Sequence, residues 1–253
     1  MYQIKELLKY KNLVHGVSTL EDGNMSFVKG QEYKIVEDKK MFLKSLYIDP
    51  HNKEVLDLNP IIRKPDKIVV VKNKKGFNFE TLNPKAKPIF ADSIVTNKKR
   101  IFFVLNLGDC FGIIFYEPKK NILALVHAGY IPVSHNIIAK TLKKLKRDFK
   151  ISLDNLVTAI TPGIWDCCLK YERIDRAELK TKKAKEYIYK KGKFNHIDLL
   201  RWILDDLRRN YINEIIVSNF CSACFTKKKF FSHIKQSEKK QKFGRNMLVV
   251  GMR

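Results

Sequence analysis

The stretch from Gly108 to Tyr130 constrains the fold more than any other part of the chain. It contains two short apolar runs, Ile113–Tyr116 and Ile122–Val126, with polar turn residues between them. This pattern is typical of a β-hairpin. Because a hairpin brings its outer ends together, we expect Cys110, before the first run, to lie beside His127, after the second.

A thiol beside an imidazole is compatible with three roles. Cys110 could be a thiolate nucleophile with His127 as its base. The two side chains could instead form part of a metal site, since both are ligands of zinc and copper. The third interpretation is structural, with Cys110 as a small buried apolar residue and His127 as a strand-end histidine with satisfied hydrogen bonds.

The length and composition of the chain indicate a globular protein with an apolar core. The chain has 253 residues, 45% of them hydrophobic, which is enough to bury a proper core. It has no apolar run of about 18 residues and starts without an apolar signal segment, so we expect no membrane partner and a cytoplasmic location. The five cysteines, an odd number, argue against a disulfide framework.

The net charge of +24 comes from 50 Lys and Arg against 26 Asp and Glu. A basic chain can attract nucleic acid or anionic substrates. The lysines are spread along the whole sequence, however, and no arginine-aromatic binding signature is present. We therefore do not expect a dedicated nucleic-acid partner.

The remaining patterns alternate between strands and helices. Strands are expected at 68–72, 101–105, 156–161, 215–218 and 247–250, and the residues between 73 and 88 form a long loop. Helices are expected at 37–46, from an N-cap at Ser134 to Phe149, at 175–190 and at 198–211. This order predicts a single mixed α/β domain, residues 1–253.

Four further cysteines raise the question of a second metal site. Cys221 and Cys224 have a two-residue gap, but Cys167 and Cys168 are adjacent. Adjacent cysteines seldom both bind one metal, so the spacing favours packing cysteines over a four-thiolate zinc site. His15 is either structural or part of the active site, and Arg245 is either an anion-binding or an ordinary surface residue.

Several short motifs occur in a fixed order and together resemble one family. They are His-Gly-x-Ser-Thr at 15–19, Asp-Gly-Asn-Met-Ser at 22–26, Ala-Asp-x-x-Val-Thr at 91–96, Asp-Cys at 109–110, His-Ala-Gly-aromatic at 127–130, Pro-Gly-Ile with a cysteine pair at 162–168, a cysteine before Phe-Phe-Ser, and Gly-Arg at 244–245. The chain resembles the laccase-domain family, also called the multicopper polyphenol oxidoreductase or purine nucleoside phosphorylase family.

The resemblance implies a four-layered α-β-β-α fold with mixed sheets. It also implies phosphorolysis of the purine nucleosides adenosine and inosine, with related cleavage of methylthioadenosine and deamination of adenosine. Purine nucleoside and phosphate would be the partners, and zinc (or copper) the cofactor. In the family the metal is held by His, Cys and His, and Cys110 and His127 fall on two of these ligands, which we expect to be catalytic. The expected substrate-binding residues are His15, Ser18, Asn24, Asp109 and Arg245.

The chain departs from the family at the third metal ligand. The family's Gln-Val-His-Gly segment matches Ile62-Arg63-Lys64-Pro65, which puts Lys64 where the histidine belongs. No histidine occurs between His51 and His127, and His51 or His15 could complete the ligand set. Two alternatives to a working phosphorylase therefore stay open. One is a non-catalytic homologue that only binds nucleoside, and the other is a metal-free Cys110/His127 hydrolase or transferase.

Overall fold

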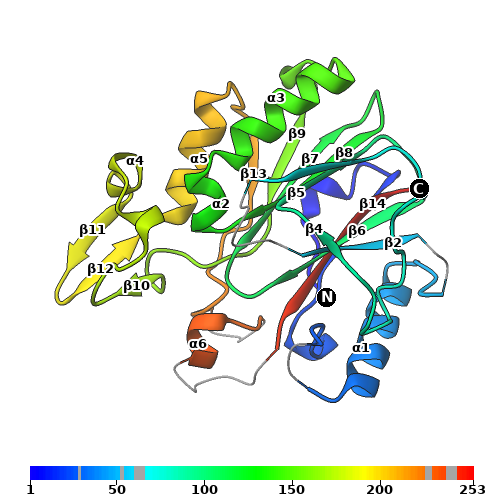
Figure 1. Ribbon diagram of the computed structural model, residues 1–253, viewed down its shortest axis with the longest axis horizontal. Coiled ribbons are helices and arrows are strands. Elements are labelled where there is room, and N and C mark those ends of the chain that lie inside the picture. Colours follow the sequence, from blue (N-terminus) through cyan, green and yellow to red (C-terminus); the bar gives the residue numbers. More distant parts are fainter. Residues whose placement is uncertain (28–29, 52–53, 60–65, 226–229, 238–243) are drawn as a thin grey trace.

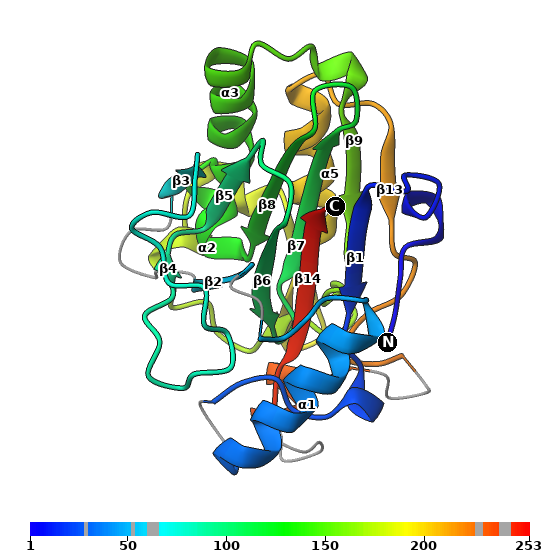
Figure 2. The ribbon, with the colours of Figure 1, turned by 90° about the vertical axis from the view of Figure 1, so that its right-hand side faces the viewer.

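Two β-sheets packed face to face form the centre of the protein in the computed structural model, which describes residues 1–27, 30–51, 54–59, 66–225, 230–237 and 244–253 (Figures 1 and 2). The first sheet has the order β1-β14-β6-β2-β4. Its strands are β1 Leu13–Val17, β2 Val55–Asn59, β4 Ile89–Phe90, β6 Ile101–Leu107 and β14 Asn246–Met252.

The second sheet has the order β13-β9-β7-β8-β5-β3. Its strands are β3 Ile68–Val71, β5 Ser93–Thr96, β7 Phe111–Glu117, β8 Ile122–Ala128, β9 Val157–Ile160 and β13 Ile215–Val217. Strands β7 and β8 pair antiparallel from Phe111 opposite Ala128 to Glu117 opposite Ile122. The predicted hairpin is thus confirmed, and both its strands are buried because the sheet is covered on both faces.

Helices cover the outer face of each sheet. Their bounds are α1 Glu32–Ser45, α2 Tyr130–Ser134, α3 Ile137–Phe149, α4 Lys182–Lys185, α5 Leu199–Arg209 and α6 His233–Ser237. Short 3₁₀ turns occur at Lys5–Leu7, Leu20–Asp22, Leu153–Asn155 and Ala177–Leu179. Helices α3 and α5 pack on the second sheet and α1 packs on the first, which gives the expected α-β-β-α layers.

Three apolar clusters correspond to the three boundaries between layers. The middle one lies between the sheets, where Phe103 and Leu248 from the first sheet contact the apolar set that includes Ile114 and Leu125 from the second. Successive side chains of a strand point to opposite faces. Strand β14 therefore sends Leu248 to the middle cluster and Val249 to the cluster under α1.

The helix predicted at 175–190 is wrong. Only a 3₁₀ turn and the four-residue α4 form there, and Ile188–Lys191 becomes β11 of a third sheet with the order β10-β12-β11. Its other strands are β10 Lys170–Tyr171 and β12 Phe194–Ile197. Gly192, at φ 59°, makes the turn between β11 and β12, a conformation that glycine adopts without strain.

The helix start predicted at Ser134 is also wrong. Ser134 ends α2, where its hydroxyl donates to the Ile131 carbonyl at 2.7 Å. The N-cap of α3 is Asn136, which adopts a left-handed conformation at φ 60°. Asparagine tolerates this region better than most residues, so the chain turns there and starts a new helix.

Candidate functional site

Cys110 and His127 lie side by side at one end of the β7–β8 hairpin. Cys110 directly precedes β7, and His127 is paired with Gly112 two residues later. A methyl group at Gly129 would lie 3.0 Å from Cys110 Sγ and 3.3 Å from His127 Nε2. The thiol and the ring nitrogen therefore face one common point, as the hairpin pattern predicted.

Asp92 fixes the orientation of the His127 ring. Its carboxylate Oδ1 accepts a hydrogen bond from His127 Nδ1 at 2.8 Å, and its backbone carbonyl accepts from the His127 amide at 2.8 Å. Asp92 is only 1% exposed, and its Oδ2 has no partner within the described part of the chain. Since Nδ1 carries the proton that Asp92 accepts, Nε2 is left facing Cys110.

The role of this residue was not predicted from the sequence, because its place beside His127 depends on the pairing of two strands. Asp92 directly precedes β5, and β5 pairs with β8 so that Ser93 lies opposite Val126. In an antiparallel pair the register runs in opposite chain directions, so the next position places Asp92 beside His127. The Ala-Asp motif at 91–92 thus supplies the third member of a Cys110–His127–Asp92 arrangement.

The electrostatics of the site favour a protonated His127 ring. Burial alone would lower its pKa, but the neighbouring Cys110 and the Asp92 carboxylate outweigh this and raise the pKa of His127 to about 9. A positively charged imidazole can donate a hydrogen bond toward the Cys110 sulfur.

Asp109 supports Cys110 from behind and has an unusual backbone. Its φ is 85°, which is uncommon for a residue other than glycine. Its carboxylate accepts from Ser222 Oγ at 3.0 Å and from the Ile234 amide at 2.8 Å, and its carbonyl accepts from the Ile164 amide at 2.7 Å. These hydrogen bonds connect the segments that contain Ser222, Ile234 and Ile164 beside Cys110. The expected contact of Asp109 with substrate stays a prediction.

Ser18, Asn24 and Arg245 gather at the start of β14. The Met247 amide donates to Ser18 Oγ at 2.8 Å, and the Arg245 amide donates to Asn24 Oδ1 at 3.0 Å. The Arg245 side chain lies against Gly108, where an added Cβ would be 2.8 Å from Arg245 Cδ. The structure thus brings these three predicted residues next to the loop that carries Cys110.

His15 lies elsewhere, on β1 at the edge of the first sheet, with its side chain buried. It is 2% exposed, its Nε2 accepts from the Ile4 amide at 2.9 Å, and its Nδ1 has no partner among the described residues. Burial lowers its pKa to about 4, so the ring is neutral at physiological pH. These contacts agree with the structural alternative, and a role in substrate binding stays a prediction.

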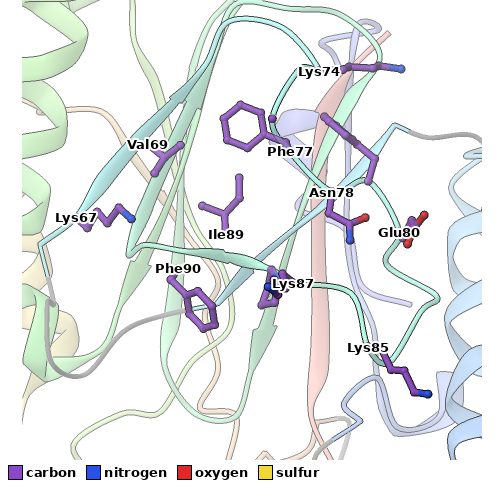
Figure 3. Close-up of a pocket in the computed structure, with 13 residues that line it drawn as sticks. Lys67, Val69, Lys74, Phe77, Asn78, Glu80, Lys85, Lys87, Ile89 and Phe90 are labelled. Atoms are coloured by element: carbon purple, nitrogen blue, oxygen red, sulfur yellow. The ribbon is translucent and has the colours of Figure 1, made fainter.

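A lysine-lined cavity of about 940 Å³ adjoins the Asp92 side of the site (Figure 3). Lys67, at its edge, accepts backbone hydrogen bonds from the Asp92 and Ser93 amides. The cavity is also lined by Lys74, Lys85 and Lys87. The sequence did not predict this cavity, because its lining comes from three segments: the start of β3, the long loop and the short strand β4.

The residues present fit a metal only in part. Cys110 Sγ and His127 Nε2 are a suitable sulfur and nitrogen pair, and Asp92 supplies the second contact that metal-bound histidines commonly have. Across the described ranges, however, no third His, Cys, Asp or Glu joins them, since the only converging group of three or more is the set of Cys167, Cys168, Cys221 and Cys224. His15 is held by Ile4, and His51 lies exposed in a turn. The segment matched to the family's third ligand, residues 62–65, is outside the described residues.

Known proteins resemble this chain in both sequence and fold. The model of the family described as multi-copper polyphenol oxidoreductase laccase matches residues 15–253. A purine nucleoside phosphorylase from Clostridium acetobutylicum is 28% identical over 56% of this chain and 60% of its own length. One from Aquifex aeolicus is 27% identical over 65% of this chain and 70% of its own length.

Solved structures share the fold over nearly the whole chain. The hypothetical protein YfiH of Bacillus licheniformis superimposes with a TM-score of 0.81 at 19% identity, covering 99% of this chain and 95% of its own. YlmD of Geobacillus stearothermophilus gives 0.80 at 18% identity, covering 96% and 93%. Among the helices that the structure describes, none has the length and apolar character needed to span a membrane.

Proposed function

The chain belongs to the multi-copper polyphenol oxidoreductase laccase family, and from this premise we propose that it cleaves purine nucleosides by phosphorolysis. Adenosine and inosine would be the substrates, with methylthioadenosine cleavage and adenosine deamination as further reactions of the same site. One observation carries the proposal: Cys110 and His127 face a common point, with Asp92 behind the ring. The two relatives named purine nucleoside phosphorylase support it.

In phosphorolysis, phosphate attacks the anomeric carbon of the ribose while the purine leaves, through a state with oxocarbenium character. Positioning and electrostatic stabilisation supply most of the rate in such a reaction. Asp92 keeps the His127 ring turned toward the reacting point, and Asp109 holds the loop of Cys110 in place. The Arg245 guanidinium beside Gly108 is a positive group suited to the phosphate. Zinc held by Cys110 and His127 would add Lewis-acid charge at this point.

The test is release of free purine from inosine or adenosine with and without phosphate. We expect release only when phosphate is present, and loss of at least a hundredfold in Cys110→Ala and His127→Ala. His135→Ala is the matched control, because His135 is exposed and bonded only near its own helix. Purified protein that turns over neither nucleoside under any metal condition contradicts the proposal and favours the non-catalytic nucleoside-binding alternative.

The Cys110–His127–Asp92 arrangement also favours a second candidate, a metal-free thiol enzyme of the hydrolase or transferase type. Here the thiolate would be the nucleophile, His127 would exchange its proton and Asp92 would orient the ring. Activity that survives a strong chelator and disappears in Cys110→Ala supports this candidate. Activity that a chelator removes and added zinc restores supports the metal-dependent phosphorylase instead.

A further inference from the structure

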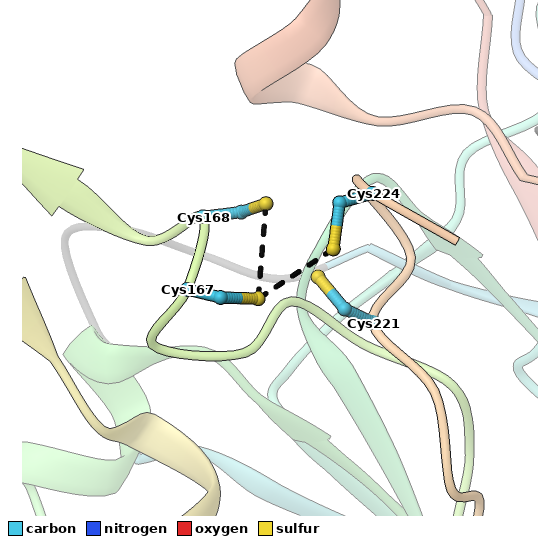
Figure 4. Close-up of side chains that lie close together, drawn as sticks. All are labelled: Cys167, Cys168, Cys221 and Cys224. Carbon is cyan, nitrogen blue, oxygen red and sulfur yellow. Dashed lines mark hydrogen bonds between the residues drawn. The ribbon is translucent and has the colours of Figure 1, made fainter. Parts of the chain in front are cut away.

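Four cysteines from two separate loops converge on one point, and none of them belongs to the Cys110–His127 pair (Figure 4). Cys167 and Cys168 lie in the loop between β9 and β10, whereas Cys221 and Cys224 follow β13. Their four Sγ atoms all lie within 4.8 Å of one another. From the sequence we do not expect the adjacent Cys167 and Cys168 to share one metal. In the structure their loop turns so that both sulfurs face those of Cys221 and Cys224 (Figure 4).

The sulfur separations match those around a tetrahedral metal. A zinc–sulfur bond of about 2.3 Å places the corners of a tetrahedron about 3.8 Å apart. Cys167 Sγ is 3.9 Å from Cys168 Sγ and 3.6 Å from Cys224 Sγ. A disulfide needs about 2.05 Å between two sulfurs and uses only one pair, so it does not account for four sulfurs that all lie within 4.8 Å of one another.

Backbone hydrogen bonds hold the two loops together around the sulfurs. Gly163 and Cys221 form a parallel β-bridge, and the Ser222 amide donates to the Gly163 carbonyl at 2.8 Å. The Trp165 amide donates to Cys221 Sγ at 3.4 Å. This contact fixes the position of the Cys221 sulfur beside the other three.

We propose that Cys167, Cys168, Cys221 and Cys224 bind a structural zinc ion. Four thiolates make a closed tetrahedral set, which is typical of structural zinc and leaves no position for a substrate. The site shares no ligand with Cys110 or His127 and does not depend on the proposed phosphorolysis.

The zinc ion has a mechanical role near the candidate active site. Both loops that it joins also bond to Asp109: the Ile164 amide donates to the Asp109 carbonyl, and Ser222 Oγ donates to its carboxylate. Asp109 directly precedes Cys110. By fixing the two loops, the zinc ion limits the movement of the backbone that presents the Cys110 thiol.

The first test uses Cys110→Ala protein, in which the other candidate site has lost a ligand. We expect one zinc ion per chain by elemental analysis, and intense visible bands of a tetrahedral tetrathiolate after exchange to cobalt(II). Adding Cys167→Ser and Cys224→Ser should remove both signals, and these two residues are exposed, so their packing loss is small. Cys110→Ala protein that binds neither zinc nor cobalt, or a cobalt spectrum unchanged by the two serine substitutions, overturns the proposal.

A second measurement on the unmutated chain avoids any failure of the variants to fold. With zinc bound, the thiols of Cys167, Cys168, Cys221 and Cys224 should resist alkylation, and a chelator should make these four reactive and lower the midpoint of thermal unfolding. Four thiols that react equally with and without the chelator, or a disulfide between Cys167 and Cys224 in the purified protein, overturn the proposal. Loss of purine release with zinc retained would contradict the proposed function alone.

Discussion

Asp92 is the residue on which the chemistry of His127 depends. A histidine between a thiol and a carboxylate has its tautomer set by the carboxylate, because the nitrogen that donates to Asp92 cannot also accept from Cys110. The same contact serves both candidate functions. In a metal site it orients the ligand nitrogen, and in a thiol enzyme it stabilises the imidazolium.

Replacing Asp92 with asparagine should lower the pKa of His127 from about 9 by about one unit or more, because the carboxylate that favours the charged ring is removed. Turnover should fall about 10- to 100-fold, as for other second contacts of a catalytic histidine. NMR titration of the His127 ring in metal-free protein gives the pKa, and Asp66→Asn, at an exposed ion pair with Lys140, is the matched control. An unchanged His127 titration would show that Asp92 does not govern the ring.

His15 makes the stability of the fold sensitive to acid. Its pKa is about 4 in the folded protein and about 6.5 when unfolded, so between these values only the unfolded chain takes up the proton. Stability from this residue is therefore full above pH 6.5 and is lost as the pH falls to 4, by about 3 kcal/mol in total. Urea unfolding between pH 7 and pH 4 should show a shallower pH dependence for His15→Leu. Identical slopes for the two proteins would contradict this assignment.

At the scale of elements, the hairpin could be predicted because its two strands are neighbours in the sequence and pair with each other in the structure. Its two apolar runs are uninterrupted, its turn is polar and its ends carry a thiol and an imidazole, so Cys110 and His127 could be paired from sequence. The partnership of Asp92 with His127 depends on β5 pairing with β8 across 35 positions of chain, which no local pattern encodes. The convergence of the four cysteines depends in the same way on the parallel pairing of β13 with β9.

The mispredicted helix at 175–190 shows how tertiary contacts override local pattern. Its lysine-rich first half allows a helix, but the Tyr-Ile-Tyr segment at 187–189 is rich in strand formers. Tyr187 stacks on Trp202 of α5 with ring centroids 5.2 Å apart. Because this ring is buried against α5, the residues that follow it pair in the third sheet and do not continue a helix.

Gly112 of β7, two residues after Cys110, faces Leu248 of β14 across the two sheets. A Cβ at this position would lie 2.4 Å from Leu248 Cδ2 in β14, and both sites are buried. Gly112→Ala should therefore destabilise the protein by about 1–3 kcal/mol through overpacking. Adding Leu248→Ala should cost less than it does in the chain with Gly112, because the new methyl occupies part of the vacated space. Urea unfolding of the four proteins measures this coupling, and additive effects would contradict a direct contact between the sheets.

At the scale of the whole molecule, the last strand completes the first sheet. Strand β14 lies between β1 and β6, with Leu13 opposite Met252 on one side and Asn246 opposite Leu107 on the other (Figure 2). Every residue of β14 is buried. The first and last strands of the chain therefore meet in the interior, and the pairing that unites them closes the longest loop in the fold.

Removing residues 246–253 should abolish cooperative folding. Each large apolar side chain of β14 contributes about 2 kcal/mol on burial, so their sum is comparable to the whole free energy of unfolding of a typical protein. The deletion also leaves the edges of β1 and β6 without their central partner. Circular dichroism with thermal unfolding should show no cooperative transition, whereas the control that lacks only Arg253, an exposed residue after β14, should unfold cooperatively. A cooperative transition in the longer deletion would mean that the second sheet and its helices fold without the first, and the four-layered core would then consist of two separable halves.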